Sequence, residues 1–223
     1  MYMPTIGAEW RTAMKMILFQ GDSITDTGKN SEGGSLISIG QGYAAMIAGD
    51  IGLVQPGKYC FVNKGISGNR IVDLYARVKT DVWNLKPDLV SLLIGVNDVL
   101  HETQCQNGVD AERFEKVYTM LIEDTIKKLP DTRFILMEPF IFRGSLTETD
   151  WDTISKQVRI RGEIVKNIAD KFNFTFVPLQ KYFDEACQIC PIEYWVGDGV
   201  HPTVAGHAII KREWLKGFSN LDI

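Results

Sequence analysis

The chain has 223 residues, of which 45% are hydrophobic and 23% charged, with a formal net charge of −4. This length fits one α/β domain with a sizeable buried core. The acidic balance argues against nucleic acid as a partner, because nucleic acid recruits a concentrated basic surface. No apolar run approaches the ~20 residues that a membrane-spanning helix needs, so we expect no membrane partner either.

The first residues do not have the pattern of a signal peptide. The apolar run Met16–Phe19 is short, and Arg11 and Lys15 lie just before it. We therefore expect a cytoplasmic protein. Residues 1–14 are predicted to form an N-terminal extension, and residues 15–223 are predicted to form a single domain.

Four cysteines occur, and two of them, Cys187 and Cys190, have C-x-x-C spacing. A zinc site needs two further ligands, usually a second such pair or a histidine pair, and the sequence has none at suitable spacing. A redox role is disfavoured because the pair lies in a loop-like stretch late in the chain. We expect reduced thiols and no metal site.

Short apolar runs alternate with longer helical patterns along the chain. The predicted strands are Met16–Gln20, Tyr59–Asn63, Leu89–Ile94, Arg133–Met137 and Phe174–Val177. The predicted helices are Gly42–Ile51, Ile71–Leu85, Ala111–Leu129, Asp150–Lys171 and Thr203–Phe218. Leu89–Ile94 is apolar enough to be a central strand, buried on both faces. The alternation predicts a three-layer α/β/α, flavodoxin-like domain with a five-stranded parallel sheet.

In such a sheet, ligands bind beyond the carboxyl ends of the strands. Polar loops follow the first three predicted strands, and a further polar segment precedes the last helix; these blocks are residues 21–25, 63–69, 95–98 and 198–202. Because parallel strands end at one edge of the sheet, the first three blocks are expected to lie close together. The fourth supplies a histidine, the side chain that changes charge near neutral pH.

The four blocks contain the parts of an acyl-transfer site. The hydroxyl of Ser23 needs a base to become a nucleophile, and His201 can be that base. Asp198 can fix the tautomer of the imidazole and stabilise the imidazolium. The backbone N–H groups of Ser23 and Gly65 and the side-chain amide of Asn97 can stabilise an oxyanion. A glycine at position 65 suits a site where substrate approaches the backbone closely.

These blocks, in this order, resemble the signature blocks of the SGNH (GDSL-type) hydrolases. Ser23, Gly65, Asn97 and His201 match the four residues that name the family, and the resemblance covers residues 16 to 218. It implies a serine carboxylic-ester hydrolase that acts through an acyl-enzyme. No metal or organic cofactor is implied.

Within the family, the chain is similar to small intracellular acetyl-xylooligosaccharide esterases. The similar stretches are GDSITD at 21–26, NKGISGN at 63–69, GVNDV at 95–99, ILMEPF at 135–140 and VHPTVAGH at 200–207. This resemblance implies an acetylated sugar or oligosaccharide as the substrate, and a homo-oligomer. Leu100 and His101 depart from the larger aromatic and basic residues expected there.

Other substrates are open, because the family also includes lipolytic esterases, lysophospholipases and thioesterases. A catalytically silent carbohydrate-binding protein is the alternative outside the enzymes. Asp22, His101 and Trp195 are candidate pocket residues. Asp22 is also expected to brace its loop, His101 to be either a pocket wall or solvent-exposed, and Trp195 to be either a pocket wall or ordinary packing. The loops 27–40 and 140–150 are expected to set the depth of the pocket.

Overall fold

The computed structural model describes residues 14–29, 38–221 and 223. Five parallel strands form one sheet in the order β2-β1-β3-β4-β5. The strands are β1 (Lys15–Gly21), β2 (Tyr59–Asn63), β3 (Leu89–Leu93), β4 (Arg133–Met137) and β5 (Thr175–Val177). This is the flavodoxin-like strand order, so the predicted fold class is confirmed. The extension predicted at residues 1–14 lies outside the described residues, except for Met14.

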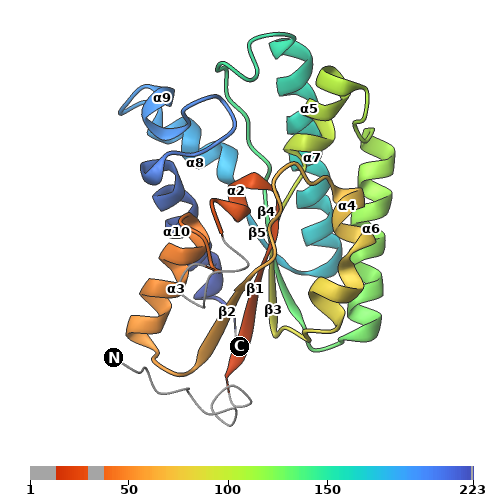
Figure 1. Ribbon diagram of the computed structural model, residues 1–223, viewed down its shortest axis with the longest axis vertical. Coiled ribbons are helices and arrows are strands. Elements are labelled where there is room, and N and C mark those ends of the chain that lie inside the picture. Colours follow the sequence, from red (N-terminus) through yellow and green to blue (C-terminus); the bar gives the residue numbers. More distant parts are fainter. Residues whose placement is uncertain (1–13, 30–37, 222) are drawn as a thin grey trace.

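Helices cover both faces of the sheet, which gives three layers (Figure 1). The helices α3 (Tyr43–Val54), α8 (Leu179–Ala186) and α10 (Val204–Phe218) lie on one face. The other face is covered by α4 (Ile71–Ala76), α6 (Ala111–Lys128) and α7 (Trp151–Phe172). The shorter elements are α2 (Ser23–Asp26), η1 (Lys79–Trp83), α5 (Val96–Cys105) and α9 (Ile192–Trp195).

Alternation along the strands divides the core between the two faces, because successive side chains of a strand point to opposite sides. In β1, Ile17 and Phe19 pack in the cluster that includes α3 and α10, whereas Leu18 packs in the cluster that includes α4 and α6. All five residues of β3 are buried. The prediction of a central strand buried on both faces is therefore confirmed.

The helix predicted over Ile71–Leu85 is interrupted in the structure. It ends as α4 at Ala76, and the π-helical turn η1 follows, closed by a bond from Asn84 N–H to the carbonyl of Lys79. At the interruption, Arg77 Nε donates to Asn69 Oδ1 at 2.9 Å. The interruption thus coincides with a tether to the loop that follows β2.

Four helices of the structure, α2, α5, α8 and α9, are absent from the sequence prediction. Two of them begin inside the polar blocks, where glycine and asparagine indicate turns. The other two are short: α8 has eight residues, and α9 has four, none of which is buried. The predicted bounds of the remaining helices differ from the observed ones by at most three residues at either end.

Helix α10 is fixed to the sheet and to α3 by buried polar contacts. Trp214 Nε1 donates to Ser91 Oγ at 2.8 Å, which joins α10 to β3. His207 Nδ1 accepts a hydrogen bond from the backbone N–H of Tyr43 at 3.2 Å, and the two rings stack. Because Gly42 has no side chain to cap α3, His207 satisfies one of the N–H groups that this helix leaves open.

This contact predicts a pH-dependent contribution to stability. Burial, together with the charge of His201, lowers the pKa of His207 from 6.5 to about 4. Because the folded pKa is the lower one, the unfolded chain binds the proton first, and stability falls as pH drops from about 6.5 towards about 4. Gln at this position can accept the Tyr43 N–H without titrating. We expect His207→Gln to remove roughly 2–3 kcal/mol of the stability loss at pH 4.5, measured by urea unfolding at pH 7 and 4.5. An equal loss in the variant and in wild type would contradict this assignment.

Candidate active site

Ser23 begins α2, two residues after the end of β1, which lies between β2 and β3 in the sheet (Figure 1). Asp22 caps this short helix, because its Oδ1 accepts a hydrogen bond from the N–H of Ile24 at 3.0 Å. The N–H groups in the first turn of a helix have no intrahelical acceptor. The N–H of Ser23 is therefore placed to donate to a group beyond the helix terminus.

The nucleophile candidate is joined to the two residues of the last block. Ser23 Oγ lies 2.9 Å from His201 Nε2, across 178 positions of sequence. His201 Nδ1 lies 2.7 Å from Asp198 Oδ2. The other carboxylate oxygen, Asp198 Oδ1, accepts the N–H groups of Val200 and His201 at 2.9 and 2.7 Å. The structure thus brings the three predicted residues into one hydrogen-bonded line.

The electrostatics of Asp198 favour this line. Burial raises the pKa of Asp198, but the hydrogen bonds from the backbone and imidazole of His201 and from Val200 outweigh it, so the pKa lies below its ordinary value. An ionised carboxylate accepts the Nδ1–H of the imidazole. That tautomer leaves Nε2 as an acceptor for the proton of Ser23, which is the arrangement that activates a serine.

The predicted oxyanion donors lie on the loops that follow the neighbouring strands. Asn97 is the second residue of α5, and its Nδ2 donates to the carbonyl of Asn69 at 3.1 Å, which leaves its second N–H for a ligand. Gly65 follows β2, and its N–H donates to Asn63 Oδ1 at 2.9 Å. An oxyanion must therefore share this N–H with Asn63 Oδ1 or take the place of Asn63 Oδ1 as its acceptor.

Gly65 is constrained by α2. A Cβ at this position would lie 2.6 Å from the nitrogen of Asp26 and 2.8 Å from Cβ of Thr25. The close approach here is made by the backbone of the helix that carries Ser23. Position 65 therefore needs glycine even without a ligand, in addition to the close approach of substrate expected there.

Several polar contacts that sequence reasoning did not identify fix the loop after β2 against α2. Asn63 Nδ2 donates to the carbonyl of Thr25 at 2.6 Å and to that of Ile39 at 2.8 Å. Lys29 Nζ donates to the carbonyl of Gly65. The sequence shows only polar residues at these places, and their partners lie on other loops. No local pattern was available to find them.

Two buried carboxylates lie near the site. Asp22 is 2% exposed and Asp98 is 0% exposed. Burial raises the pKa of Asp22 to about 6 and that of Asp98 to about 7. Asp98 accepts the N–H of Ile71 at 3.0 Å and Asp22 accepts that of Ile24, so each carboxylate braces the first turn of a helix. The burial of Asp22 leaves almost no surface for the substrate contact that was also predicted for it.

His101 lies on α5 beside the loop that carries Gly65. Its Cε1 is 3.9 Å from the place that a Cβ of Gly68 would occupy. Burial, followed by the charge of Arg70, lowers the pKa of His101. The side chain is half-buried, which removes the fully exposed alternative. Contact of His101 with substrate stays a prediction.

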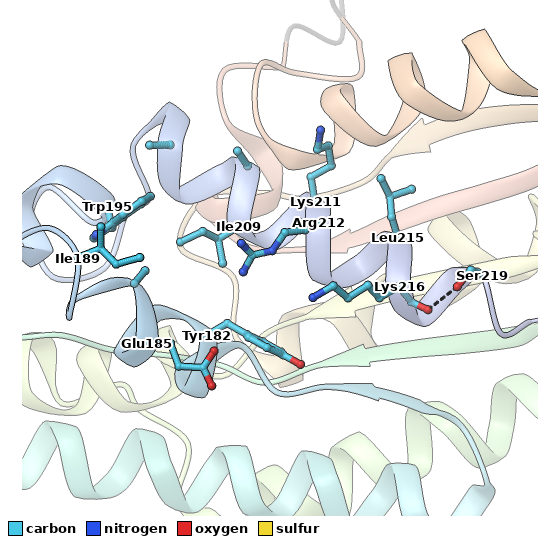
Figure 2. Close-up of a pocket in the computed structure, with 13 residues that line it drawn as sticks. Tyr182, Glu185, Ile189, Trp195, Ile209, Lys211, Arg212, Leu215, Lys216 and Ser219 are labelled. Atoms are coloured by element: carbon cyan, nitrogen blue, oxygen red, sulfur yellow. Dashed lines mark hydrogen bonds between the residues drawn. The ribbon is translucent and has the colours of Figure 1, made fainter.

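Trp195, the other candidate pocket residue, ends α9 and lines a groove of about 830 Å³ between α8 and α10. Figure 2 shows Trp195 at one end of this groove and Ser219 at the other. Trp195 Nε1 donates to the carbonyl of Cys190 at 3.1 Å. The residues that line the groove do not include Ser23, Asp198 or His201. These contacts favour packing over a place in the wall of an acyl pocket.

None of the four cysteines forms a disulfide bond. Burial raises the pKa of Cys187. Within residues 14–29, 38–221 and 223, no cluster of three or more histidine, cysteine or carboxylate side chains is arranged to hold a metal ion. No helix in these ranges has the length and apolar character to cross a membrane.

A serine joined to a histidine and an aspartate, at the carboxyl edge of a parallel sheet, defines the class of serine hydrolases. Residues 19–209 match the model of the GDSL-like lipase/acylhydrolase family. The chain belongs to this family, and it is a serine ester hydrolase.

The comparisons also identify individual relatives. The chain is 37% identical over 207 residues to an acetylxylan esterase of Geobacillus stearothermophilus, covering 90% of this chain and 92% of the relative. A crystal structure of that enzyme aligns with a TM-score of 0.82, 36% identity and coverage of 91% and 93%. The crystal structure of a putative GDSL-like lipase from Parabacteroides merdae aligns with a TM-score of 0.86, 31% identity and coverage of 92% and 95%.

The geometry predicts a measurable role for the Asn97 amide. We expect Asn97→Ala to lower kcat for a simple ester by about 10²–10³-fold, because one oxyanion donor is lost in the transition state. Asn84→Ala is the matched control, since Asn84 is exposed and precedes β3 at the opposite edge of the sheet. Steady-state kinetics on p-nitrophenyl acetate measures both. Equal kcat values in the two variants would remove Asn97 from the oxyanion site.

Proposed function

We propose that this protein removes acetyl groups from the hydroxyls of a xylo-oligosaccharide or a similar small sugar, with Ser23 as the nucleophile. The observation that carries the proposal is the hydrogen-bonded line from Ser23 to His201 and Asp198, with distances of 2.9 and 2.7 Å. The 37% identity with an acetylxylan esterase supports acetyl as the acyl group and a sugar as the alcohol.

The first half of the reaction forms an acetyl-enzyme. Ser23 Oγ attacks the ester carbonyl carbon while His201 Nε2 takes the hydroxyl proton. The ionised Asp198 stabilises the imidazolium that forms. The carbonyl oxygen becomes an oxyanion, which accepts from the N–H of Ser23, from the amide of Asn97 and from Gly65 once its N–H is shared. The imidazolium then protonates the sugar oxygen, which leaves as an alcohol.

The second half releases acetate by the same groups in the same order. His201 Nε2 removes a proton from water, and the hydroxide attacks the acetyl carbon on Ser23. The oxyanion again rests on the same donors. Collapse of the tetrahedral intermediate returns the proton to Ser23 Oγ and frees acetate. All the groups that this cycle uses are side chains or backbone N–H groups of the chain.

Variants of the Geobacillus enzyme support the roles of the three residues. Its solved structures include changes of a serine, an aspartate and a histidine that are called catalytic mutants. The aspartate and the histidine are three positions apart in that enzyme, as Asp198 and His201 are here. The same chemistry at the same spacing favours equal roles in the two proteins.

We further propose that the protein acts in the cytoplasm as a homo-oligomer, without a nucleic-acid partner. The resemblance to intracellular esterases and the acidic balance of the chain support this proposal. Light scattering on the purified protein is expected to give a mass that is a multiple of 25.1 kDa. A mass of one chain at micromolar concentration would exclude the oligomer under those conditions.

The proposed reaction is tested with p-nitrophenyl esters from acetate to palmitate. We expect kcat/KM to fall steeply beyond acetate in wild type, because an acetylesterase does not accommodate long acyl chains. Ser23→Ala is expected to lose at least ~10³-fold in kcat, since the triad acts as a unit. Acetylated xylo-oligosaccharides are the next substrates, with acetate release measured directly.

The other outcomes separate the alternatives. A preference for long chains would indicate a lipolytic member of the family. Equal activity of wild type and Ser23→Ala would refute the assignment of Ser23. A folded wild type that neither hydrolyses esters nor is labelled at Ser23 by a fluorophosphonate would indicate a silent carbohydrate-binding protein.

A further inference from the structure

The segment that carries Asp198 is seated on the loop between β4 and α7, which contains none of the four sequence blocks. Residues 142–147 of this loop form a turn, named here the 142–147 turn. The N–H of Phe142 donates to the carbonyl of Gly199 at 2.9 Å, and the N–H of Leu146 donates to the carbonyl of Asp198 at 3.1 Å. Two backbone hydrogen bonds therefore hold the peptide units beside the carboxylate that faces His201.

The 142–147 turn and the segment that carries Asp198 meet without room for a side chain. A Cβ at Gly144 would lie 2.4 Å from the carbonyl carbon of Asp198 and 2.5 Å from the nitrogen of Gly199. Conversely, Gly199 has φ +95°, and a Cβ there would lie 2.5 Å from the carbonyl oxygen of Phe142. Only glycine fits either position. The backbone of the turn thus sets the position of the backbone of Asp198 directly.

Thr147 closes the turn from inside. Its side chain is 0% exposed. The hydroxyl donates to the carbonyl of Phe142 at 2.6 Å and accepts the N–H of Gly144 at 2.9 Å. A Cβ at Gly199 would come within 2.7 Å of the same hydroxyl oxygen. The buried hydroxyl of Thr147 therefore links two residues of the turn: Phe142, whose N–H bonds Gly199, and Gly144, which contacts Asp198.

We propose that Thr147 is a positioning residue, which holds the 142–147 turn in the shape that aims the carboxylate of Asp198 at His201. The inference rests on the proposed function, because it assigns a role to Thr147 through Asp198. Asp198 supplies only one oxygen to the imidazole, at 2.7 Å, while the other is bound by two N–H groups of its own turn. A shift of this turn by a fraction of an ångström misdirects the carboxylate, and small misplacements of this kind are costly in catalysis.

The test compares variants that remove or keep the hydroxyl. Thr147→Val keeps the shape and removes both hydrogen bonds, and we expect kcat for p-nitrophenyl acetate to fall by about 10–100-fold with KM within about twofold. Thr147→Ser keeps the hydroxyl, and we expect it to restore most of the activity. Thr149→Val is the matched control, because Thr149 is exposed on the same loop. A kcat loss that Thr147→Ser does not restore would overturn the proposal.

A double-mutant cycle separates positioning from a general loss of structure. If Thr147 acts through Asp198, Thr147→Val lowers kcat by less than about twofold in an Asp198→Ala background. A full additional loss in that background would overturn the proposal. If Thr147→Val does not fold, Thr147→Ala serves the same cycle, because it also removes the hydroxyl and adds no bulk to the turn. An active wild type with an unaffected Thr147→Val refutes only this inference, whereas an inactive wild type or an active Ser23→Ala refutes the proposed function.

Discussion

Parallel pairing of β1 with both β2 and β3 is the constraint on which the site depends. The register sets Phe19 beside Asn63 on one side and Gly21 beside Leu93 on the other, so the three strands end at nearly the same height. Ser23 follows the middle strand, and the loops with Gly65 and Asn97 follow its two neighbours. The proposed nucleophile therefore lies between two proposed oxyanion donors without any long-range loop to place them.

The acid–base half of the site is held differently, because it does not follow a strand of the sheet. The segment with Asp198 and His201 is closed on itself by a bridge between Val196 and Pro202. It leads into α10, where the N-cap Thr203 accepts the N–H of Gly206. Its outer side rests on the 142–147 turn. The hydrogen-bonded line from Asp198 to Ser23 therefore joins two parts that are positioned independently. The sheet positions Ser23, whereas the bridge, α10 and the 142–147 turn position the segment with Asp198 and His201.

Two carboxylates near the site are buried, and burial disfavours their charged forms. Both Asp22 and Asp98 have a pKa raised by burial, which means that their ionised forms are disfavoured in the folded protein. Each nevertheless accepts a backbone N–H near the proposed site. Their hydrogen bonds fix the backbone at Ile24 and Ile71.

The amino-acid sequence was enough to predict the sheet, its central strand and the five residues of the proposed reaction. Apolar alternation and polar blocks are local patterns, and parallel topology gathers the strand ends without further information. Three features became visible only in the folded chain: Gly65 donates to Asn63, the helix after Ile71 breaks near Arg77, and Trp195 lines the groove between α8 and α10. The folded chain alone places Thr147 behind Asp198. These contacts join residues distant in sequence through single hydrogen bonds and close backbone approaches, which leave no periodic trace along the chain.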